Sequence, residues 1–492
     1  MLSNMSNINP FDRINSYFNN SDSKAFDGLS YSADSLFISS RENKKRLIVV
    51  DSNTDGERLY RELDTFNQNI ADNELIFIPG TEEMPYDMVD SDKYLSSKKN
   101  LGLMQLINSK STKLTVITTI KNLQKRLIPK NDLVKETIYI EKDIELDVEG
   151  LRKKLTNMGY LLNPQVNFHG EFSIRGSIID IYAGGYEYPI RIDLNDINIE
   201  SIRYFNVDSQ ITTDEEIIDK ICIVPIGNII CNDENVITFR KKYREIFEGN
   251  PNKNNIYTSI SNQIIPQGFN NYFPLLYSET NSLFEYFIGI DDWIIFDSIF
   301  NRLTNNCKTI SDKFNYIKQN EELFLEPKKL YIEENELLEK IHGKKPITLY
   351  KDKTLSSNSY NFNVSSVPDI SIKPYLEKPI NDLLNHIDSS KCVILFSTDN
   401  IKISQFEDIF SSNHLEYKKI SSLKDININE HKFYIIDRYI SSSFRINELS
   451  MSFIVSGDII KEKIRQHTSK KNAKSSFFID QLKNLEVGAP VV

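Results

Sequence analysis

The sequence predicts a multidomain α/β protein, and three observations lead to this fold class. The chain has 492 residues, which at roughly 100–200 residues per domain corresponds to about three domains. Between Leu36 and about Ile128, continuous apolar runs alternate with amphipathic stretches, a pattern typical of a parallel sheet covered by helices on both faces. Between residues 171 and 205, short runs alternate apolar and polar residues and are separated by turn residues, which indicates an antiparallel meander.

The first part of the chain, residues 1–132, is expected to form the parallel-sheet domain. After an apolar run, SLFIS (35–39), the expected strands are LIVVD (47–51), LIFIPG (75–80) and LTVITTI (114–120). The segments with apolar residues at helical spacing are TDGERLYRELDTF (54–66), KNLGLMQLI (99–107) and KNLQKRLI (121–128).

The second part, residues 133–221, is expected to form an inserted mixed α/β domain. A helix over residues 147–161 precedes three expected strand segments, EFSIRGSIIDIYA (171–183), EYPIRIDL (187–194) and INIESIRYF (197–205). Gly184-Gly185 and Asn195-Asp196 separate these segments and have the chemistry of tight turns, so the segments should pair in antiparallel fashion.

The rest of the chain divides into four further stretches. Residues 222–350 mix helix and strand signals and are assigned to one domain, and the polar residues 351–377 are expected to be a linker. Residues 378–458, with strands expected at 392–396, 433–437 and 452–456, predict a small α/β domain. Residues 459–485 read as a basic linker helix, and EVGAPVV (486–492) reads as the start of a further domain at which the chain is truncated.

Composition excludes several classes of protein. The four cysteines form no CxxC pair and the six histidines do not cluster, so we expect no metal site and no disulfide scaffold. The sequence has no signal peptide and no run of 18 apolar residues, so we expect a cytoplasmic protein. A formal net charge of −10 argues against a general DNA coat protein, since phosphate contacts dominate non-specific DNA affinity.

The motifs of a nucleotide hydrolase are missing. A phosphate-binding loop would be expected at residues 26–35. The sequence there is FDGLSYSADS, with one glycine and no lysine. The single Gly-Lys pair, Gly343-Lys344, runs into Lys345-Pro346, and Asp297, at the end of WIIFD, is followed by a serine instead of a glutamate. We therefore expect no catalytic residue, no bound cofactor and no ATP hydrolysis.

The other candidate chemical groups have structural interpretations. His169 lies beside a Gly-Glu turn and is interpreted as a structural histidine. Asp180, Asp193 and Asp208 could suggest a carboxylate site, but arginines lie nearby, which favours ordinary ion pairs.

A pair of arginines in the meander is the sharper signal. Arg191 lies between two isoleucines and should face away from them. If the turn centres near Gly184, Arg175 and Arg191 are diagonal neighbours on one face of adjacent antiparallel strands. Two guanidiniums on one face suit a partner that carries carboxylates. The alternative is that Asp193 or Glu187 neutralises them locally. Because an exposed arginine contributes little to stability, we expect either one to be replaceable without harm to the fold.

The meander also carries a family resemblance. HGEFSIRGSIIDIY and YPIRIDLNDINIESIRYFNVDSQIT, within residues 169–212, resemble the second domain of bacterial transcription-repair coupling factors. IFIPGTEEMPYD (76–87) and LTVITTIKNLQKRLIP (114–129) are similar to the first domain of that family, and LKNLEVGAPVV (482–492) is similar to the start of its RNA-polymerase-interacting domain. The resemblance covers essentially the whole chain.

The resemblance implies a fold and a function. In this family the N-terminal part is a module like the excinuclease component UvrB, with a degenerate RecA-type nucleotide domain that agrees with the missing phosphate loop. The complete protein displaces stalled RNA polymerase from double-stranded DNA with an ATP- and magnesium-dependent motor, and recruits UvrA for nucleotide-excision repair. The polymerase-binding and motor domains would lie beyond Val492. This chain would be the UvrA-recruiting scaffold.

The family's UvrA-contacting residues carry over one by one. Arg175 and Arg191 match its two arginines, whereas Asn195 stands where the family usually has a phenylalanine, so an apolar anchor is lost at that position. The segment Ser96-Ser97-Lys98-Lys99 also departs from the family, because it has lysine in place of arginine.

Two other functions remain as alternatives. The first is a helicase or ATPase of the UvrB type in nucleotide-excision repair, which the missing Gly-Lys-Thr loop disfavours; residues 84–100 are also too short and too poor in tyrosine for a damage-clamping hairpin. The second is nucleic-acid binding through the basic residues 461–474, for which a solvated interdomain helix is the plainer interpretation. We expect that segment to give at most weak, salt-sensitive DNA binding.

Overall fold

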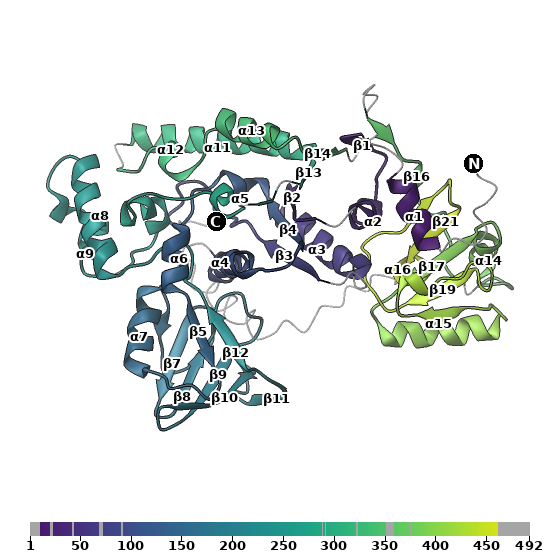
Figure 1. Ribbon diagram of the computed structural model, residues 1–492, viewed down its shortest axis with the longest axis horizontal. Coiled ribbons are helices and arrows are strands. Elements are labelled where there is room, and N and C mark those ends of the chain that lie inside the picture. The colour runs from purple at the N-terminus through teal and green to yellow at the C-terminus, as the bar shows by residue number, and fades with distance from the viewer. Residues whose placement is uncertain are drawn as a thin grey trace, which may run out of the picture. The chain divides into compact units, whose positions relative to one another are not determined.

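The computed structural model describes residues 10–19, 23–41, 44–67, 72–89, 92–287, 289–290, 292–320, 323–350, 359–373 and 375–460. The chain divides into two compact units, the first of which comprises Met1–Ser365 together with Ser422–Ile426 and Tyr439–Ser441. Within the described ranges, no helix is long and apolar enough to cross a membrane. The predicted fold class, a multidomain α/β protein, is confirmed (Figure 1).

A seven-stranded sheet forms the centre of the first unit. Its strand order is β15-β1-β14-β13-β2-β4-β3, and its neighbouring strands pair in parallel. The strands are β1 (Ala25–Asp27), β2 (Arg46–Val50), β3 (Asn73–Ile78), β4 (Lys113–Thr119), β13 (Asp292–Phe296), β14 (Ile347–Leu349) and β15 (Tyr360–Asn361). The chain thus leaves this sheet after β4 and returns to it at β13. Strand β15 lies within the stretch that we expected to be a linker.

Helices connect the strands of this sheet. They are α2 (Ala33–Ser40), α3 (Asn53–Asn67), α4 (Lys93–Asn108), α5 (Ile120–Gln124), α11 (Ser298–Gln319), α12 (Pro327–Leu330) and α13 (Glu334–Gly343), and α1 (Pro10–Phe18) precedes them. Asp92 caps α4 by accepting a hydrogen bond from the Leu95 amide. The expected helix over 121–128 is too long, because Lys125 and Leu127 leave it to form bridges with Tyr331 and Asn281.

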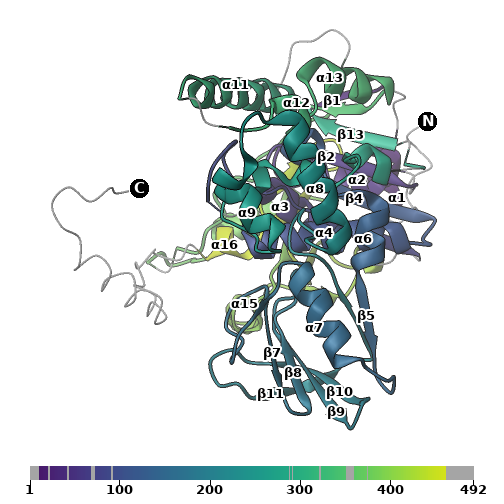
Figure 2. The same cartoon turned by 90° about the vertical axis from the view of Figure 1, so that its left-hand side faces the viewer.

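The chain between β4 and β13 builds a lobe around a sheet that is antiparallel except for the parallel pair of β6 and β7. Its six strands have the order β11-β10-β9-β8-β7-β6, and β5 and β12 form a separate pair. The elements are α6 (Lys130–Glu136), β5 (Ile138–Glu141), α7 (Val148–Asn157), β6 (Leu161–Leu162), β7 (Glu171–Arg175), β8 (Ile178–Ile181), β9 (Ile190–Asn195), β10 (Asn198–Phe205), β11 (Thr212–Ile217) and β12 (Lys220–Ile223). One face of the six-stranded sheet packs against α7 around Leu151, Leu155 and Ile179 (Figure 2). We call the opposite face of this six-stranded sheet the outer face.

One strand prediction in this lobe is wrong. Residues 171–183 do not form a single strand, because the chain turns after Arg175 at Gly176, which has φ +60°. The result is a hairpin of β7 and β8. Arg175 on β7 and Arg191 on β9 are therefore not on adjacent strands, as expected, but have β8 between them.

The lobe continues into a helical stretch before the chain returns to β13. Its elements are α8 (Asp233–Ile246), η1 (Pro251–Lys253), α9 (Asn255–Ser261), η2 (Phe269–Asn271), η3 (Phe273–Leu276) and α10 (Leu283–Tyr286).

The second unit is a small α/β domain. Its strands β18, β19, β17 and β21 are parallel neighbours in that order, and β20 pairs antiparallel with β21. Its elements are α14 (Asn381–Asp388), β17 (Cys392–Phe396), α15 (Asn400–Ser412), β18 (Lys418–Ile420), β19 (Phe433–Ile436), β20 (Phe444–Ile446), β21 (Met451–Val455) and α16 (Ser456–Ile459). The expected basic segment 461–474 and the closing residues 486–492 lie outside the described residues.

Candidate functional site

The outer face of the six-stranded sheet carries five charged residues of both signs in two neighbouring rows. The register places Asp180 on β8 opposite Arg191 on β9, and Arg191 opposite Arg203 on β10. Arg175 on β7 and Asp193 on β9 lie in the next row, each opposite Ile178 of β8. We call Arg175, Asp180, Arg191, Asp193 and Arg203 the charge ladder.

Asp180 joins the two arginines that the sequence singled out. Its side chain is fully buried, at 0% exposure. Arg191 donates from Nε to Oδ1 over 2.7 Å and from Nη2 to Oδ2 over 2.9 Å, while Arg175 donates from Nη2 to Oδ2. The sequence-derived alternative, neutralisation by Asp193 or Glu187, named the wrong carboxylates, because the carboxylate that pairs with both arginines is Asp180.

Arg191 makes further internal contacts besides those to Asp180. Its remaining Nη1 donates to the carbonyl of Gln210 over 3.1 Å, and its guanidinium lies 4.7 Å from the ring centroid of Phe205. The Gln210 side chain in turn donates to the carbonyls of Val166 and Val207, which keeps the loop over the outer face. The hydrogen bonds to Asp180 raise the pKa of Arg191. The signature FNVDSQIT (205–212) thus serves to fix Arg191.

Arg175 differs from Arg191 in exposure. Its side chain is 47% exposed, against 14% for Arg191, and its hydrogen bond to Asp180 uses one of the five N–H donors of a guanidinium. Arg175 can therefore offer donors to a partner, whereas Arg191 has few left to offer.

Arg203 and Asp193 form the other end of the ladder. Arg203 Nη2 donates to Asp193 Oδ2 over 2.6 Å, and Ser201 Oγ donates to the same oxygen over 2.7 Å. Burial would raise the pKa of Asp193, but these two hydrogen bonds outweigh it and hold the pKa below its ordinary value. Arg203 was not among the residues singled out from the sequence. The available signal was its position in β10, where apolar and polar residues alternate.

Asn195 ends β9 on the same face as Arg191 and Asp193, because alternate residues of a strand share a face. It pairs with Asn198 across a hairpin turn in which Asp196 has φ +60°. Its side chain is exposed. The structure therefore places all three sequence-derived site residues, Arg175, Arg191 and Asn195, on the outer face.

The other residues considered from sequence have structural roles. His169 donates a hydrogen bond from Nε2 to the Tyr186 carbonyl over 3.0 Å, and the centroids of its ring and the Tyr182 ring lie 3.8 Å apart. Asp208 lies in an exposed turn that the Asn206 side chain stabilises. Within the described residues, no group of three His, Cys, Asp or Glu side chains could hold a metal ion.

The lobe contacts helix α4 through its glycine turn. A Cβ on Gly184 would lie 1.8 Å from Ser97 Oγ, and a Cβ on Gly185 would lie 2.8 Å from a Leu101 methyl. These two glycines therefore let the turn lie directly on α4. The segment 96–99, in which lysine replaces the arginine of the family that the sequence resembles, is part of the surface that they contact.

Lys99 of α4 is buried behind that contact. Its Nζ donates to Asn228 Oδ1 over 3.2 Å, and the side chain has almost no exposure. Burial, together with repulsion from Lys125, lowers the pKa of Lys99 to about 8, although Glu83 opposes the shift.

The position of a phosphate-binding loop, between β1 and α2, is filled by protein. Gly28 has φ +74°, and a Cβ there would lie 2.1 Å from the carbonyl oxygen of Phe362. The backbone that follows β15 thus occupies the space in front of the loop.

Carboxylates surround the start of α2. Arg58 donates to Asp34 over 2.6 and 2.9 Å and to Glu62 over 2.8 Å, and both carboxylates are buried. Glu62 also accepts hydrogen bonds from the Ser32 hydroxyl over 2.7 Å and from the Ser441 amide over 2.9 Å. Burial raises the pKa of Asp34. Two acids with one arginine make this position unsuited to a phosphate group, since like charges repel.

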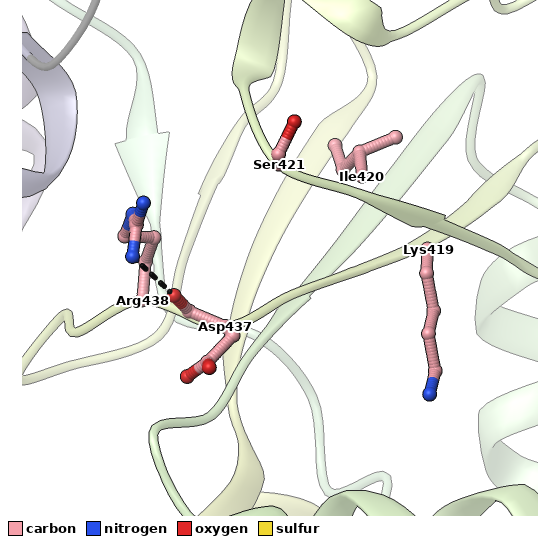
Figure 3. Close-up of a pocket in the computed structure, with 5 residues that line it drawn as sticks. All are labelled: Lys419, Ile420, Ser421, Asp437 and Arg438. Atoms are coloured by element: carbon pink, nitrogen blue, oxygen red, sulfur yellow. Dashed lines mark hydrogen bonds between the residues drawn. The ribbon is translucent and has the colours of Figure 1, made fainter.

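The second unit has a hollow of about 520 Å³ at the ends of β18 and β19 (Figure 3). Lys419, Ile420, Ser421, Asp437 and Arg438 line it. Lys419 forms an ion pair with Glu407, and Arg438 donates to the carbonyl of Asp437 over 3.0 Å. Although such strand ends often bind ligands, both basic side chains that line this hollow already make contacts within the protein.

A family model described as UvrB interaction domain matches residues 138–228, which include the whole charge ladder. The chain is similar to the transcription-repair-coupling factor of Haemophilus influenzae, with 28% identity over 473 residues that cover 94% of this chain and 40% of that protein. The protein of the same name from Escherichia coli is 23% identical over 450 residues, which cover 88% of this chain and 38% of that protein. The chain therefore spans about two-fifths of the length of these curated relatives.

Proposed function

We propose that this chain, which belongs to the transcription-repair-coupling factor family and corresponds to an N-terminal part of its members, is a docking module that binds UvrA. The UvrB interaction domain match supports a role in DNA repair. The observation that carries the proposal is the half-exposed Arg175, fixed on an outer sheet face by the buried Asp180.

The chemistry of the outer face suits a protein partner with acidic side chains. Guanidinium groups that a buried carboxylate has already oriented lose little conformational entropy when they bind a second carboxylate. In this proposal Arg175 and Arg191 form the contact region, and Asn195 takes the place of an aromatic residue at its edge.

The test is a titration of purified UvrA against the chain and its Arg175→Glu variant. Arg152→Glu is the matched control, because Arg152 lies on α7, on the other face of the sheet, with a side chain that is 50% exposed. We expect Arg175→Glu to weaken binding at least tenfold and Arg152→Glu to leave it unchanged. Absence of binding by the unmodified chain would overturn the proposal.

The wider activity is also a proposal, because the chain spans only part of its relatives. As part of a longer protein, the module would bring UvrA to a site where an ATP- and magnesium-dependent motor displaces stalled RNA polymerase from double-stranded DNA. The filled phosphate-loop position supports the view that this module contributes binding and no ATP hydrolysis.

A further inference from the structure

We infer that Arg203, at the far end of the charge ladder, is a second contact residue of the docking face, and that the partner presents two separated carboxylates to Arg175 and Arg203. This inference rests on the proposed function and specifies the chemistry of the same face. Neither the family resemblance nor the sequence analysis assigns a role to Arg203.

The two arginines have equivalent positions at the ends of the ladder. Each makes an ion pair with one ladder carboxylate, Arg175 with Asp180 and Arg203 with Asp193. Each also stays accessible, with side-chain exposures of 47% and 34%. The internal hydrogen bond of Arg203, from Nη2 to Asp193 Oδ2, uses one of its five N–H donors.

Arg191 lies between these two end residues and already uses three of its five N–H donors in internal hydrogen bonds. Its four donated or stacked contacts, to both oxygens of Asp180, the Gln210 carbonyl and the Phe205 ring, are internal. Arg191 therefore fixes the spacing of the ladder, and the end arginines are the groups that a partner reaches first.

The spacing defines the partner. Arg175 on β7 and Arg203 on β10 lie three strands apart, which at about 4.8 Å per strand and a small offset along the strands is on the order of 15 Å. Asp193, with 22% exposure, lies between them in the ladder. The continuous row of phosphates in a nucleic acid would bring a negative charge next to the Asp193 carboxylate, which would repel it. Two separate acidic side chains on a protein could reach Arg175 and Arg203 without this repulsion. The ladder thus favours an acidic protein surface over nucleic acid.

An apolar residue lies between the two end arginines. Ile178 is opposite both Arg175 and Asp193 in the register, so it lies on the outer face, and it is half-buried outside the core cluster. Interfaces commonly have an apolar centre with charged residues around it. Residue 195 of this chain is an asparagine and offers no apolar side chain to the interface. Ile178 can provide the apolar centre instead.

The experiment measures UvrA affinity for the full chain, the Arg175→Gln variant and the double variant Asp193→Asn/Arg203→Gln. The double variant removes Arg203 together with its internal partner, so it leaves no buried carboxylate unpaired and tests binding without a large fold defect. Arg152→Gln is the control, and thermal melts of every variant monitor folding. A duplex DNA titration of the unmodified chain and the double variant runs in parallel.

We expect the double variant to bind UvrA at least fivefold more weakly than the unmodified chain, with a smaller dependence of affinity on salt. Unchanged affinity in the double variant, alongside weaker binding by Arg175→Gln, would overturn the role of Arg203 and leave the proposed function standing. No UvrA binding by the unmodified chain would overturn both. DNA binding that the double variant abolishes would overturn the choice of an acidic protein as partner.

Discussion

Arg191 donates to both carboxylate oxygens of Asp180, with 2.7 Å from Nε to Oδ1 and 2.9 Å from Nη2 to Oδ2. This two-point contact joins adjacent strands on the outer face of the sheet, and its carboxylate is fully buried. The contact makes Arg191 a structural residue as well as a candidate interface residue, and the two roles can be separated by experiment.

The first prediction concerns stability. Arg191→Ala should lower the free energy of unfolding by about 3 kcal/mol, because it leaves a buried carboxylate with one weaker partner. Arg175→Ala should cost less than about 1 kcal/mol, since that arginine is half-exposed. Urea denaturation of both variants measures the difference. This result would support the sequence-based expectation of an undisturbed fold for Arg175 and contradict it for Arg191, whereas equal denaturation midpoints would contradict the distinction.

The second prediction concerns the contact between the lobe and α4. Gly184→Ala should destabilise the protein by several kcal/mol, because the new Cβ would lie 1.9 Å from Ser97 Cβ. Adding Ser97→Gly should restore much of the loss, since the nearest remaining atom is then Ser97 Cα at 3.3 Å. Thermal melts compare the single and double variants.

A matched control is Gly343→Ala, where a Cβ meets nothing within 4 Å. This variant should melt like the unmodified chain. If Gly184→Ala also did so, the close approach of the turn to α4 would be wrong.

The third prediction is a pH dependence caused by Lys99. Its pKa of about 8 in the folded protein is below its ordinary value of 10.5. Between these two pH values the unfolded chain binds the proton and the folded chain does not, so the free energy of unfolding should rise with pH by about 3 kcal/mol. Lys99→Met should abolish this rise and stabilise the protein at pH 7.

Lys98→Met is the control for other groups that titrate in the same range, because Lys98 is the neighbouring lysine of α4 and is only partly buried. Denaturation at pH 7.5 and pH 10 of the three proteins gives the comparison. A pH dependence that survives in Lys99→Met would mean that another group causes it.

The fourth prediction is that the chain neither binds nor hydrolyses ATP. Phe362 fills the space in front of Gly28, and Asp34 and Glu62 bring negative charge to the place of the phosphates. Phosphate release should stay at background in millimolar ATP and magnesium, with Asp297→Asn as the control at the end of β13. Turnover that Asp297→Asn abolished would be incompatible with this view.

The sequence predicted the layers of the fold because strands β2, β3 and β17 contain continuous apolar runs, which leave little choice of structure. It did not predict the break between β7 and β8. The signal was present: Ile178 and Ile179 are consecutive apolar residues, so the alternation slips by one position next to Gly176. A two-residue turn is easily missed when apolar residues continue on both sides.

The sequence also predicted one part of the candidate site and missed another. Strand alternation correctly placed Arg191 away from its flanking isoleucines, and the register confirms that Arg175 shares its face. The reason differs from the expected one, because β8 lies between the two strands and supplies Asp180. Which carboxylate neutralises an arginine depends on the strand order, and sequence spacing alone does not give that order.

The last prediction tests the position at which this chain differs from the family that its sequence resembles. Asn195 is exposed at the end of β9 and makes no hydrogen bond through its side chain among the described residues, so Asn195→Phe should leave the melting temperature nearly unchanged. A phenylalanine there adds apolar area beside Arg191 and Asp193, and burial of that ring against UvrA should strengthen binding by about 1–2 kcal/mol, roughly tenfold. Calorimetric titration of UvrA against Asn195→Phe, with Asn195→Ala as the control that removes the amide without adding a ring, measures the effect. Equal affinities for all three proteins would show that residue 195 lies outside the contact, and would leave Ile178 as the apolar centre of the face.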